Sequence, residues 1–325
     1  MLTFNEITEI ITSEIEQLNW NKEPRGLYEP IGYVLSLGGK RIRPALTLMA
    51  CNLFQDDVQP AVNTALGLEV FHNFTLLHDD IMDRADVRRG RPTVQKKWND
   101  NTAILSGDVM QIASYQLIAD TPPAYLKSVL DLFSQTAAEI CEGQQYDVDF
   151  ENRDEVKAEE YLEMIRLKTA VLLGCALKCG AWIGGAGDED AQNLYDFGIN
   201  IGLAFQLKDD LLDVYGDEAT FGKKIGGDIL CNKKTYLLIH ALKLATGETE
   251  KELNNWLNIS DEKLADKKIQ SVTEIYNHLG VRTICEDKML EFYTKAVASL
   301  EKVSVSDNKK HLLRNLASKL MSRND

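Results

Sequence analysis

The distribution of proline constrains this chain more than any other feature of its sequence. The protein has 325 residues, and its seven prolines are Pro24, Pro30, Pro44, Pro60, Pro92, Pro122 and Pro123. Proline breaks the interior of a helix because it lacks a backbone N–H and clashes with the preceding turn. The stretch from residue 124 to the end is therefore free to form long helices.

Apolar residues recur at spacings of three and four in this stretch, as in Leu194, Phe197 and Ile201, and no segment shows sustained alternation. We therefore predict an all-α protein. The expected helices span residues 4–19, 41–54, 60–83, 101–119, 123–147, 158–184, 189–215, 233–243, 260–278, 283–302 and 308–321. No low-complexity linker or abrupt change of composition divides the chain, which favours a single domain over residues 1–325.

Charge and cysteine usage exclude several classes of protein. The chain has 36 Lys and Arg against 50 Asp and Glu, a net charge of −14. A general nucleic-acid or anionic-membrane surface is therefore disfavoured, and a polyanionic ligand must meet a local basic cluster or a metal. Six scattered cysteines and a start that lacks the pattern of an export signal favour the cytoplasm. The most apolar stretch, residues 170–187, is interrupted by Lys178 and predicts a buried helix, with no membrane span.

Two clusters of aspartate share one spacing. The first, in LLHDDIMD, comprises Asp79, Asp80 and Asp83, and the second, in FQLKDDLLD, comprises Asp209, Asp210 and Asp213. Offsets of three and four place carboxylates on one face of a helix, where they repel one another and the negative end of the helix dipole. A single copy is typical of a solvated helix end, but two copies without His or Cys indicate Mg²⁺ and a polyphosphate.

Basic residues that suit a phosphate lie near both clusters. They are Lys40, Arg41, Arg43, Arg88, Arg89, Lys168, Lys223, Lys224, Lys233 and Lys234. Any one of them could be a solvated surface residue. That interpretation explains the whole set poorly, because the basic residues gather near both clusters in an acidic chain. The chain lacks both the GxxxxGK[ST] spacing and a GxGxxG motif after a predicted strand, which disfavours a P-loop or dinucleotide enzyme.

Five motifs occur in order between residues 38 and 236: GGKRIRP, HDDIMDRADVRRGRPT, RLKTA, FQLKDDLLDVYGDEATFGKKIGGDI and NKKTY. In these motifs the chain resembles the trans-isoprenyl diphosphate synthases, the family of farnesyl and geranylgeranyl diphosphate synthases. The resemblance implies a single-domain all-α bundle around a deep central cavity, and a homodimer. It also implies Mg²⁺-dependent, head-to-tail condensation of isopentenyl diphosphate with an allylic diphosphate.

The resemblance also implies roles for individual residues. Asp79, Asp83 and Asp209 would bind Mg²⁺ directly, three ions in all, with Asp80, Asp210 and Asp213 as ligands or as partners through water. The residues that match contacts to the allylic diphosphate are Arg88, Lys168, Thr169, Gln206, Lys223 and Lys233. Those that match contacts to isopentenyl diphosphate are Lys40, Arg43, His72 and Arg89. His72 also fits a buried core histidine, and Asn232 stands where many relatives carry Gly.

Product length should depend on how deep the cavity runs below the first cluster. A helix rises about 1.5 Å per residue, which puts Phe74 about 7.5 Å and Phe71 about 12 Å below Asp79. A ring at that depth can block a growing tail, although both rings also fit ordinary core aromatics. The first cluster lacks the two-residue insertion of typical bacterial farnesyl synthases and has Thr75, not a second aromatic, beside Phe74. In this it resembles the geranylgeranyl type, which implies a C20 product over C15.

Three alternatives share part of the pattern. A class I terpene cyclase would share the first cluster but would normally carry a different second metal motif. A head-to-head condensing enzyme is disfavoured by GGKRIRP, and a non-catalytic synthase subunit is disfavoured by two intact clusters.

Overall fold

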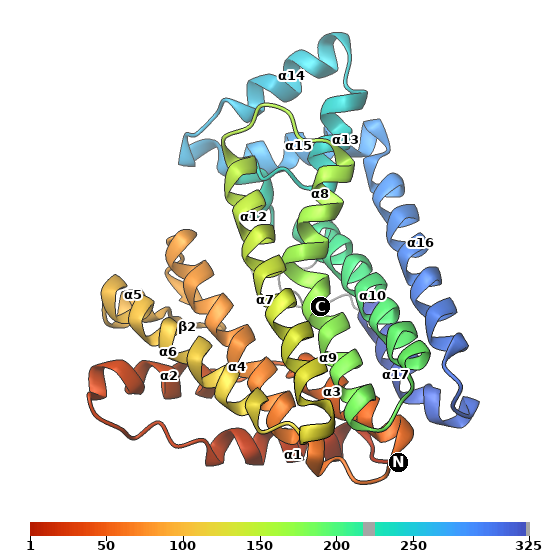
Figure 1. The fold of residues 1–325 in the computed structure, drawn as a ribbon. Coiled ribbons are helices and arrows are strands. Elements are labelled where there is room, and N and C mark those ends of the chain that lie inside the picture. Colours follow the sequence, from red (N-terminus) through yellow and green to blue (C-terminus); the bar gives the residue numbers. More distant parts are fainter. Residues whose placement is uncertain (217–224, 323–325) are drawn as a thin grey trace. The chain divides into compact units, whose positions relative to one another are not determined.

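Helices make up almost all of the regular structure (Figure 1). The computed structural model describes residues 1–216 and 225–322. The chain forms two compact units, which we describe separately. Unit 1 comprises Met1–Gln135, Leu172–Tyr195 and Lys302–Leu313, and unit 2 comprises Thr136–Val171, Asp196–Glu301 and Arg314–Asp325. The prediction of an all-α protein is confirmed. The prediction of a single domain around a central cavity concerns both units together, and it stays a prediction.

Unit 1 is built around one buried helix, α4. Its elements in chain order are α1 (Phe4–Gln17), α2 (Arg25–Ser36), α3 (Ile42–Phe54), α4 (Gln59–Met82), β1 (Val87–Arg88), β2 (Arg91–Pro92), α5 (Val94–Lys97) and α6 (Asp100–Ala119). Helix α4 packs against α6 and α3, while α2 packs against α6 and α1 against α3. Residues on every side of α4 are buried between Ala61 and Asp80, as its nearly uniform apolar sequence requires.

The end of α4 fixes where the first aspartate cluster lies. Pro60 stands in the first turn, where a missing backbone N–H costs nothing. The helix runs to Met82 with Asp83 as its C-cap, so Asp79 and Asp80 occupy the last turn. All three carboxylates therefore sit at the negative end of the helix dipole.

A two-residue hairpin follows α4 and carries two arginines. Val87 pairs with Pro92 and Arg88 with Arg91, which leaves Arg89 and Gly90 as the turn. Their φ angles are 53° and 73°, as a type I′ turn requires. The sequence VRRGRPT thus forms a hairpin that holds Arg88 and Arg89 in fixed positions.

The apolar stretch over residues 170–187 is a buried helix, as predicted. Helix α9 (Val171–Ile183) packs Gly180 against α3. A Cβ added at Gly180 would lie 2.0 Å from the Thr47 carbonyl oxygen, so only glycine permits this approach. Within the described residues, none of the helices has the length and apolar character needed to cross a membrane.

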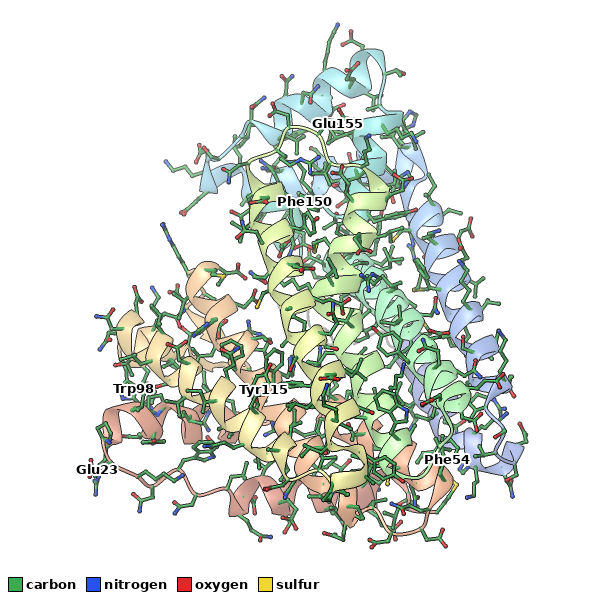
Figure 2. All side chains as sticks on the ribbon, in the orientation of Figure 1. Glu23, Phe54, Trp98, Tyr115, Phe150 and Glu155 are labelled. Atoms are coloured by element: carbon green, nitrogen blue, oxygen red, sulfur yellow. The ribbon has the colours of Figure 1, made fainter. Side chains whose placement is uncertain are left out.

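Unit 2 is a second helical core. Its elements are the rest of α7 (Pro123–Glu151), α8 (Ala158–Ile165), η1 (Arg166–Ala170), α10 (Asp188–Tyr215), α12 (Gly227–Leu230), α13 (Tyr236–Leu244), α14 (Gly247–Leu257), η2 (Glu262–Leu264), α15 (Ala265–Leu279), α16 (Val281–Lys302) and α17 (Asp307–Ser322). Helices α7, α9, α10, α16 and α17 contribute residues to both units. Phe150, labelled in Figure 2, lies in a core with Tyr161, Leu207 and Tyr276.

The predicted helices agree with the structure except at a few positions. Helices α2, α5, α12 and α14 were not predicted, and the expected helix over 158–184 is interrupted by a π-helical turn, η1, at Arg166–Ala170. Pro30 lies inside α2, and the sequence of α14 is mostly polar. Proline interrupts the apolar repeat of α2, and the repeat of α14 is confined to Leu253, Trp256 and Leu257, so neither pattern identifies a helix from sequence.

We expect Gly107→Ala to destabilise unit 1. A Cβ at Gly107 of α6 would lie 2.2 Å from Nε2 of His78, whose ring N–H donates to the Ile104 carbonyl at 3.2 Å. His78 must then move, at a cost of about 1–3 kcal/mol in the free energy of unfolding, measured by urea denaturation. Gly26→Ala in α2 is the control, since nothing lies within 4 Å of the added Cβ. It should stabilise the protein slightly, by about 0.4–1 kcal/mol. Equal effects would contradict this packing.

Candidate active site

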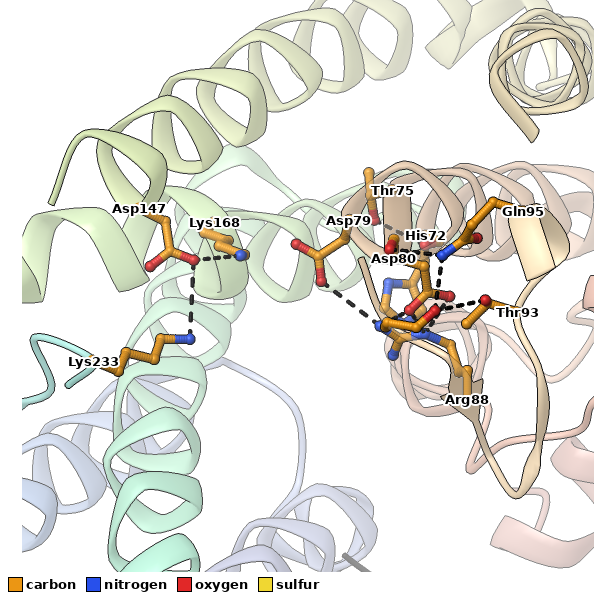
Figure 3. Close-up of polar contacts among 11 residues, drawn as sticks. His72, Thr75, Asp79, Asp80, Arg88, Thr93, Gln95, Asp147, Lys168 and Lys233 are labelled. Atoms are coloured by element: carbon orange, nitrogen blue, oxygen red, sulfur yellow. Dashed lines mark hydrogen bonds and ion pairs between the residues drawn. The ribbon is translucent and has the colours of Figure 1, made fainter. Parts of the chain in front are cut away.

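The first aspartate cluster is organised by one arginine in unit 1 (Figure 3). Nε of Arg88 donates to both carboxylate oxygens of Asp80 at 2.8 Å, and its Nη2 lies 2.8 Å from Oδ1. The same Nη2 lies 3.7 Å from Asp79. Asp80 is only 4% exposed, whereas Asp83 is exposed. Burial raises the pKa of Asp80, and the bonds from Arg88 oppose that rise.

The loop after α4 is held to the backbone at the end of that helix. Nε2 of Gln95 donates to the backbone carbonyls of Asp80 and Ala85, at 2.8 and 2.9 Å. The hydroxyl of Thr93 donates to the Ala85 carbonyl at 2.7 Å. These bonds connect the hairpin to the end of α4, so Arg88 has little freedom to leave Asp80.

Two motifs that are distant in sequence meet beside this cluster. Arg89 donates a hydrogen bond to the Gly38 carbonyl. A Cβ at Gly39 would lie 2.8 Å from the Arg89 guanidinium, and both glycines have positive φ angles, 79° and 130°. The GGKRIRP turn, with the exposed Lys40, is therefore packed directly against the hairpin.

Arg43 and His72 form a pair in the same unit. Nη1 of Arg43 lies 3.0 Å from Nε2 of His72. Burial and Arg43 hold the pKa of His72 well below its usual range, so the ring is neutral and Nε2 accepts. Burial also lowers the pKa of Arg43 to about 10, which leaves the guanidinium charged at neutral pH. The predicted isopentenyl-diphosphate residues Lys40, Arg43, His72 and Arg89 thus all belong to unit 1.

Glu69 is a functional candidate that the sequence did not reveal. Its carboxylate is 2% exposed and accepts from Arg41 Nη1 at 2.6 Å and from Asn73 Nδ2 at 3.0 Å. Arg41 also donates to the Leu35 carbonyl at 2.6 Å. A charged residue within the apolar run LGLEVFHNF was the available signal.

The second aspartate cluster lies on α10 in unit 2. Asp210 is 4% exposed. It accepts from the Tyr161 hydroxyl and from Gln206 Nε2, the latter at 3.3 Å. Burial and the nearby charge of Asp228 raise its pKa, and those two hydrogen bonds act in the opposite direction. Asp209 lies beside Asp210, on the last turns of the helix, and is half-buried. Tyr161 was not identified from the sequence.

Asp213 holds the chain that follows the second cluster. Its Oδ2 accepts from the backbone N–H of Asp228 at 3.0 Å, and its carbonyl accepts from that of Gly226 at 2.6 Å. Lys223, predicted to contact the allylic diphosphate, and its neighbour Lys224 lie outside the described residues.

Two predicted phosphate ligands in unit 2 share one carboxylate. Oδ2 of Asp147 lies 2.6 Å from Lys168 Nζ and 4.0 Å from Lys233 Nζ (Figure 3). Burial acts to raise the pKa of Asp147, but the two lysines hold it below its ordinary value. No motif in the sequence indicated Asp147, because its partners come from η1 and from the segment before α13.

The π-helical turn η1 presents Lys168 and Thr169. Gly143 of α7 permits this, since a Cβ there would lie 2.4 Å from the Lys168 backbone nitrogen. The Thr169 hydroxyl donates to Gln206 Oε1 at 3.3 Å. Such turns interrupt the regular ladder of helical hydrogen bonds and are frequent at functional sites.

Asn232 adopts the backbone that a glycine would favour. Its φ is 53°, in the left-handed region that Asn tolerates better than most residues. Its Nδ2 donates to the Leu257 carbonyl at 2.7 Å, and its Oδ1 accepts from buried Lys268 at 2.8 Å. These bonds stabilise the turn, so the departure from the family pattern keeps the backbone path that leads to Lys233.

The predicted chain-length residues belong to an aromatic cluster in unit 1. The Phe71 ring is fully buried, 5.1 Å from that of Phe133 and 5.4 Å from that of Phe74. The ring of Tyr115, labelled in Figure 2, lies 4.8 Å from Phe133. The Thr75 hydroxyl donates to the His72 carbonyl at 2.8 Å.

We expect His72→Gln to reduce the loss of stability at acid pH. The folded protein keeps His72 neutral, whereas the unfolded chain binds a proton near pH 6.5. The contribution of His72 to the free energy of unfolding is therefore complete above about pH 7. It falls as the pH falls, by about 1 kcal/mol between pH 7 and 5.5. Glutamine can still accept from Arg43 but does not titrate. Urea unfolding at both pH values would measure the difference, and an unchanged loss in the variant would contradict the assignment.

Comparisons with known proteins agree with this arrangement. The family model described as polyprenyl synthetase matches residues 24–279. A geranylgeranyl pyrophosphate synthase of Geoglobus acetivorans is 35% identical over 316 residues, covering 97% of this chain and 96% of its own. A geranylfarnesyl diphosphate synthase of Natronomonas pharaonis is 34% identical over 336 residues, covering 98% and 96%. A crystal structure of a geranylgeranyl pyrophosphate synthase matches with a TM-score of 0.95 at 44% identity, covering 100% of both chains.

The family predicted from the five motifs is therefore confirmed, both by sequence and by fold. The chain belongs to the polyprenyl synthetase family.

Proposed function

We propose that this chain is a prenyltransferase that condenses isopentenyl diphosphate head to tail with an allylic diphosphate, giving a short trans-prenyl diphosphate of C20 length. The observation that carries the proposal is that each aspartate cluster is accompanied in its own unit by cationic side chains. Arg88 and Arg89 accompany the first, and the Lys168–Asp147–Lys233 group belongs to the unit of the second. The names of full-length relatives, which include synthases of geranylgeranyl and geranylfarnesyl diphosphates, support a short-chain product.

The donors in both clusters fit Mg²⁺. They are carboxylate oxygens without a His or Cys companion, the ligands of a hard cation. Over the described ranges 1–216 and 225–322, no three acidic, His or Cys side chains converge to hold an ion alone. Magnesium typically uses one or two carboxylates and completes its shell with water and phosphate oxygens. We propose Asp79, Asp83 and Asp209 as ligands, with three ions per site. Bound Mg²⁺ would supply charge neutralisation of the diphosphate leaving group.

The chain's own residues would orient both substrates. Arg88, Lys168 and Lys233 bind the allylic diphosphate, while Arg43 and Arg89 hold isopentenyl diphosphate. The allylic C–O bond breaks, and the double bond of isopentenyl diphosphate attacks the resulting carbocation to form the new C–C bond. One proton is then lost to the departed diphosphate, and the chain is longer by five carbons. Holding both reactants at a fixed separation, away from water, favours condensation over hydrolysis.

The alternatives explain fewer residues. A terpene cyclase binds only one diphosphate substrate. It would leave unexplained why Arg89 and the GGKRIRP turn, which together supply the proposed isopentenyl-diphosphate contacts, pack against each other. A non-catalytic subunit would not need both clusters intact. A metal buffer would not need the arginines at all.

We also propose a homodimer in the cytoplasm. One side of α6 exposes large apolar residues, with Ile104, Leu105 and Ile112 43%, 57% and 59% exposed. A second copy of the chain would cover this face, since large apolar side chains exposed on one side of a helix mark association surfaces.

The proposed reaction is tested by mass spectrometry of the products. We expect a C20 diphosphate from purified protein, Mg²⁺, isopentenyl diphosphate and C5, C10 or C15 allylic diphosphates. Asp79→Asn and Asp209→Asn should each lower turnover about a thousandfold, the effect of losing several kcal/mol of charge stabilisation. Asp86→Asn is the matched control, because its carboxylate is solvent-exposed and paired with Lys96. Hydrocarbon products, or full turnover in both aspartate variants, would reject the proposal.

Phe74→Ala should lengthen the product. Removing this ring opens space beside Phe71 in the aromatic cluster, and chains beyond C20 should appear in the same assay. Phe54→Ala, at the end of α3 and outside that cluster, is the control and should leave the product at C20. If the product of Phe74→Ala stays at C20, another residue limits the length of the product.

A further inference from the structure

Tyr161 is a buried side chain to which the proposed reaction assigns no role. It is 1% exposed, so its hydroxyl has no access to solvent. That hydroxyl donates to Oδ2 of Asp210 across 49 residues of sequence.

Asp210 connects Tyr161 to two residues that face the proposed substrate. Its Oδ1 accepts from Gln206 Nε2 at 3.3 Å, and Gln206 Oε1 accepts from the Thr169 hydroxyl at 3.3 Å. All four residues belong to unit 2. They form a continuous chain, Tyr161–Asp210–Gln206–Thr169, which we call the tyrosine chain.

The donor protons in the tyrosine chain all point toward Asp210. The geometry orients the amide of Gln206, because its NH₂ group donates to Asp210 and its oxygen accepts from the Thr169 hydroxyl. The hydroxyl of Thr169 donates its only proton to Gln206 Oε1. Its remaining lone pairs, and those of the amide oxygen, are then directed away from Asp210, which makes this end of the chain electronegative.

We propose that Tyr161 is a positioning residue for ionisation of the allylic substrate, because it fixes Asp210 and thereby the direction of the Gln206 and Thr169 dipoles. The inference rests on the proposed function and on the resemblance by which Gln206 and Thr169 contact the allylic diphosphate, beside the C–O bond that breaks. Dipoles fixed in advance stabilise a developing charge without reorganising during the reaction. With the hydroxyl of Tyr161 removed, Asp210 is held on one side only, and the amide of Gln206 is free to turn.

The test is Tyr161→Phe, with Tyr236→Phe as the matched control. Tyr236 is a buried tyrosine whose ring lies 6.3 Å from that of Tyr161, and its hydroxyl is no part of the tyrosine chain. We expect kcat to fall roughly 10- to 100-fold in Tyr161→Phe, less than the loss of a direct contact. The Kd of nonreactive geranyl thiodiphosphate with Mg²⁺, measured by calorimetry, should stay within about twofold, and the stoichiometry of binding corrects for any misfolded fraction. Tyr236→Phe should keep native kcat.

A double-mutant cycle separates positioning from a general structural role. In a Gln206→Ala background, Tyr161 has no amide left to orient, so Tyr161→Phe should change kcat by less than about twofold. An equal loss of kcat in both backgrounds overturns the proposal, as does a matching rise in Kd. A native protein that makes no elongated product would instead reject the proposed function.

Asp210→Asn keeps the test decisive if Tyr161→Phe does not fold. The variant retains the volume of the side chain and leaves Tyr161 in place, but it replaces one accepting oxygen with a donating NH₂ group. We expect the same loss of kcat with an unchanged Mg²⁺ requirement. Native kcat, or a shifted Mg²⁺ requirement that marks Asp210 as a metal ligand, would overturn the proposal.

Discussion

The structure of both clusters depends on how a buried carboxylate is stabilised at the end of a helix. Three aspartates within one turn repel one another, and the helix dipole adds to that repulsion at a C-terminus. In each cluster the second aspartate is the buried one, and each receives donors from its own unit. Asp80 is held by Arg88, and Asp210 by Tyr161 and Gln206. A buried carboxylate without such partners costs several kcal/mol. The hairpin that carries Arg88 and the helix that carries Tyr161 are thus as necessary to the motif as its aspartates.

The cationic side of the site follows the same rule. Arg41, Arg43, Arg88 and Arg89 all belong to unit 1, where the buried carboxylate of Glu69 is a counter-charge to Arg41. In unit 2, Asp147 serves Lys168 and Lys233 in the same way. One acid among several cations prevents their repulsion from unfolding the region, yet leaves an excess of positive charge. This excess of positive charge suits the diphosphate substrates proposed above.

The sequence predicted what depends on local spacing and missed what depends on distant partners. The ends of α4 and α10 were placed to within a residue or two, because turn residues follow each apolar repeat, as Gly216 does after α10. Helix α2 was missed because Pro30 interrupts its pattern, and α14 because its face toward the core is narrow. Glu69 and Tyr161 could not be found this way, since their partners lie 28 and 49 residues away. Asn232 was flagged as a departure, but only the bond to Lys268 shows how its backbone is stabilised.

The basic residues are presented where the backbone departs from regular structure. Arg89 and Asn232 have φ angles of 53°, and Lys168 lies in the π-helical turn. Each departure costs energy and persists only when surrounding contacts determine it. Those contacts are present: Arg89 bonds to Gly38, Asn232 to Lys268, and η1 packs on Gly143. The irregular backbone therefore fixes cationic side chains that would otherwise be flexible, and less conformational entropy is lost when an anion binds. A regular helix alone does not give this precision, which explains why these cationic side chains lie where helices are interrupted or have ended.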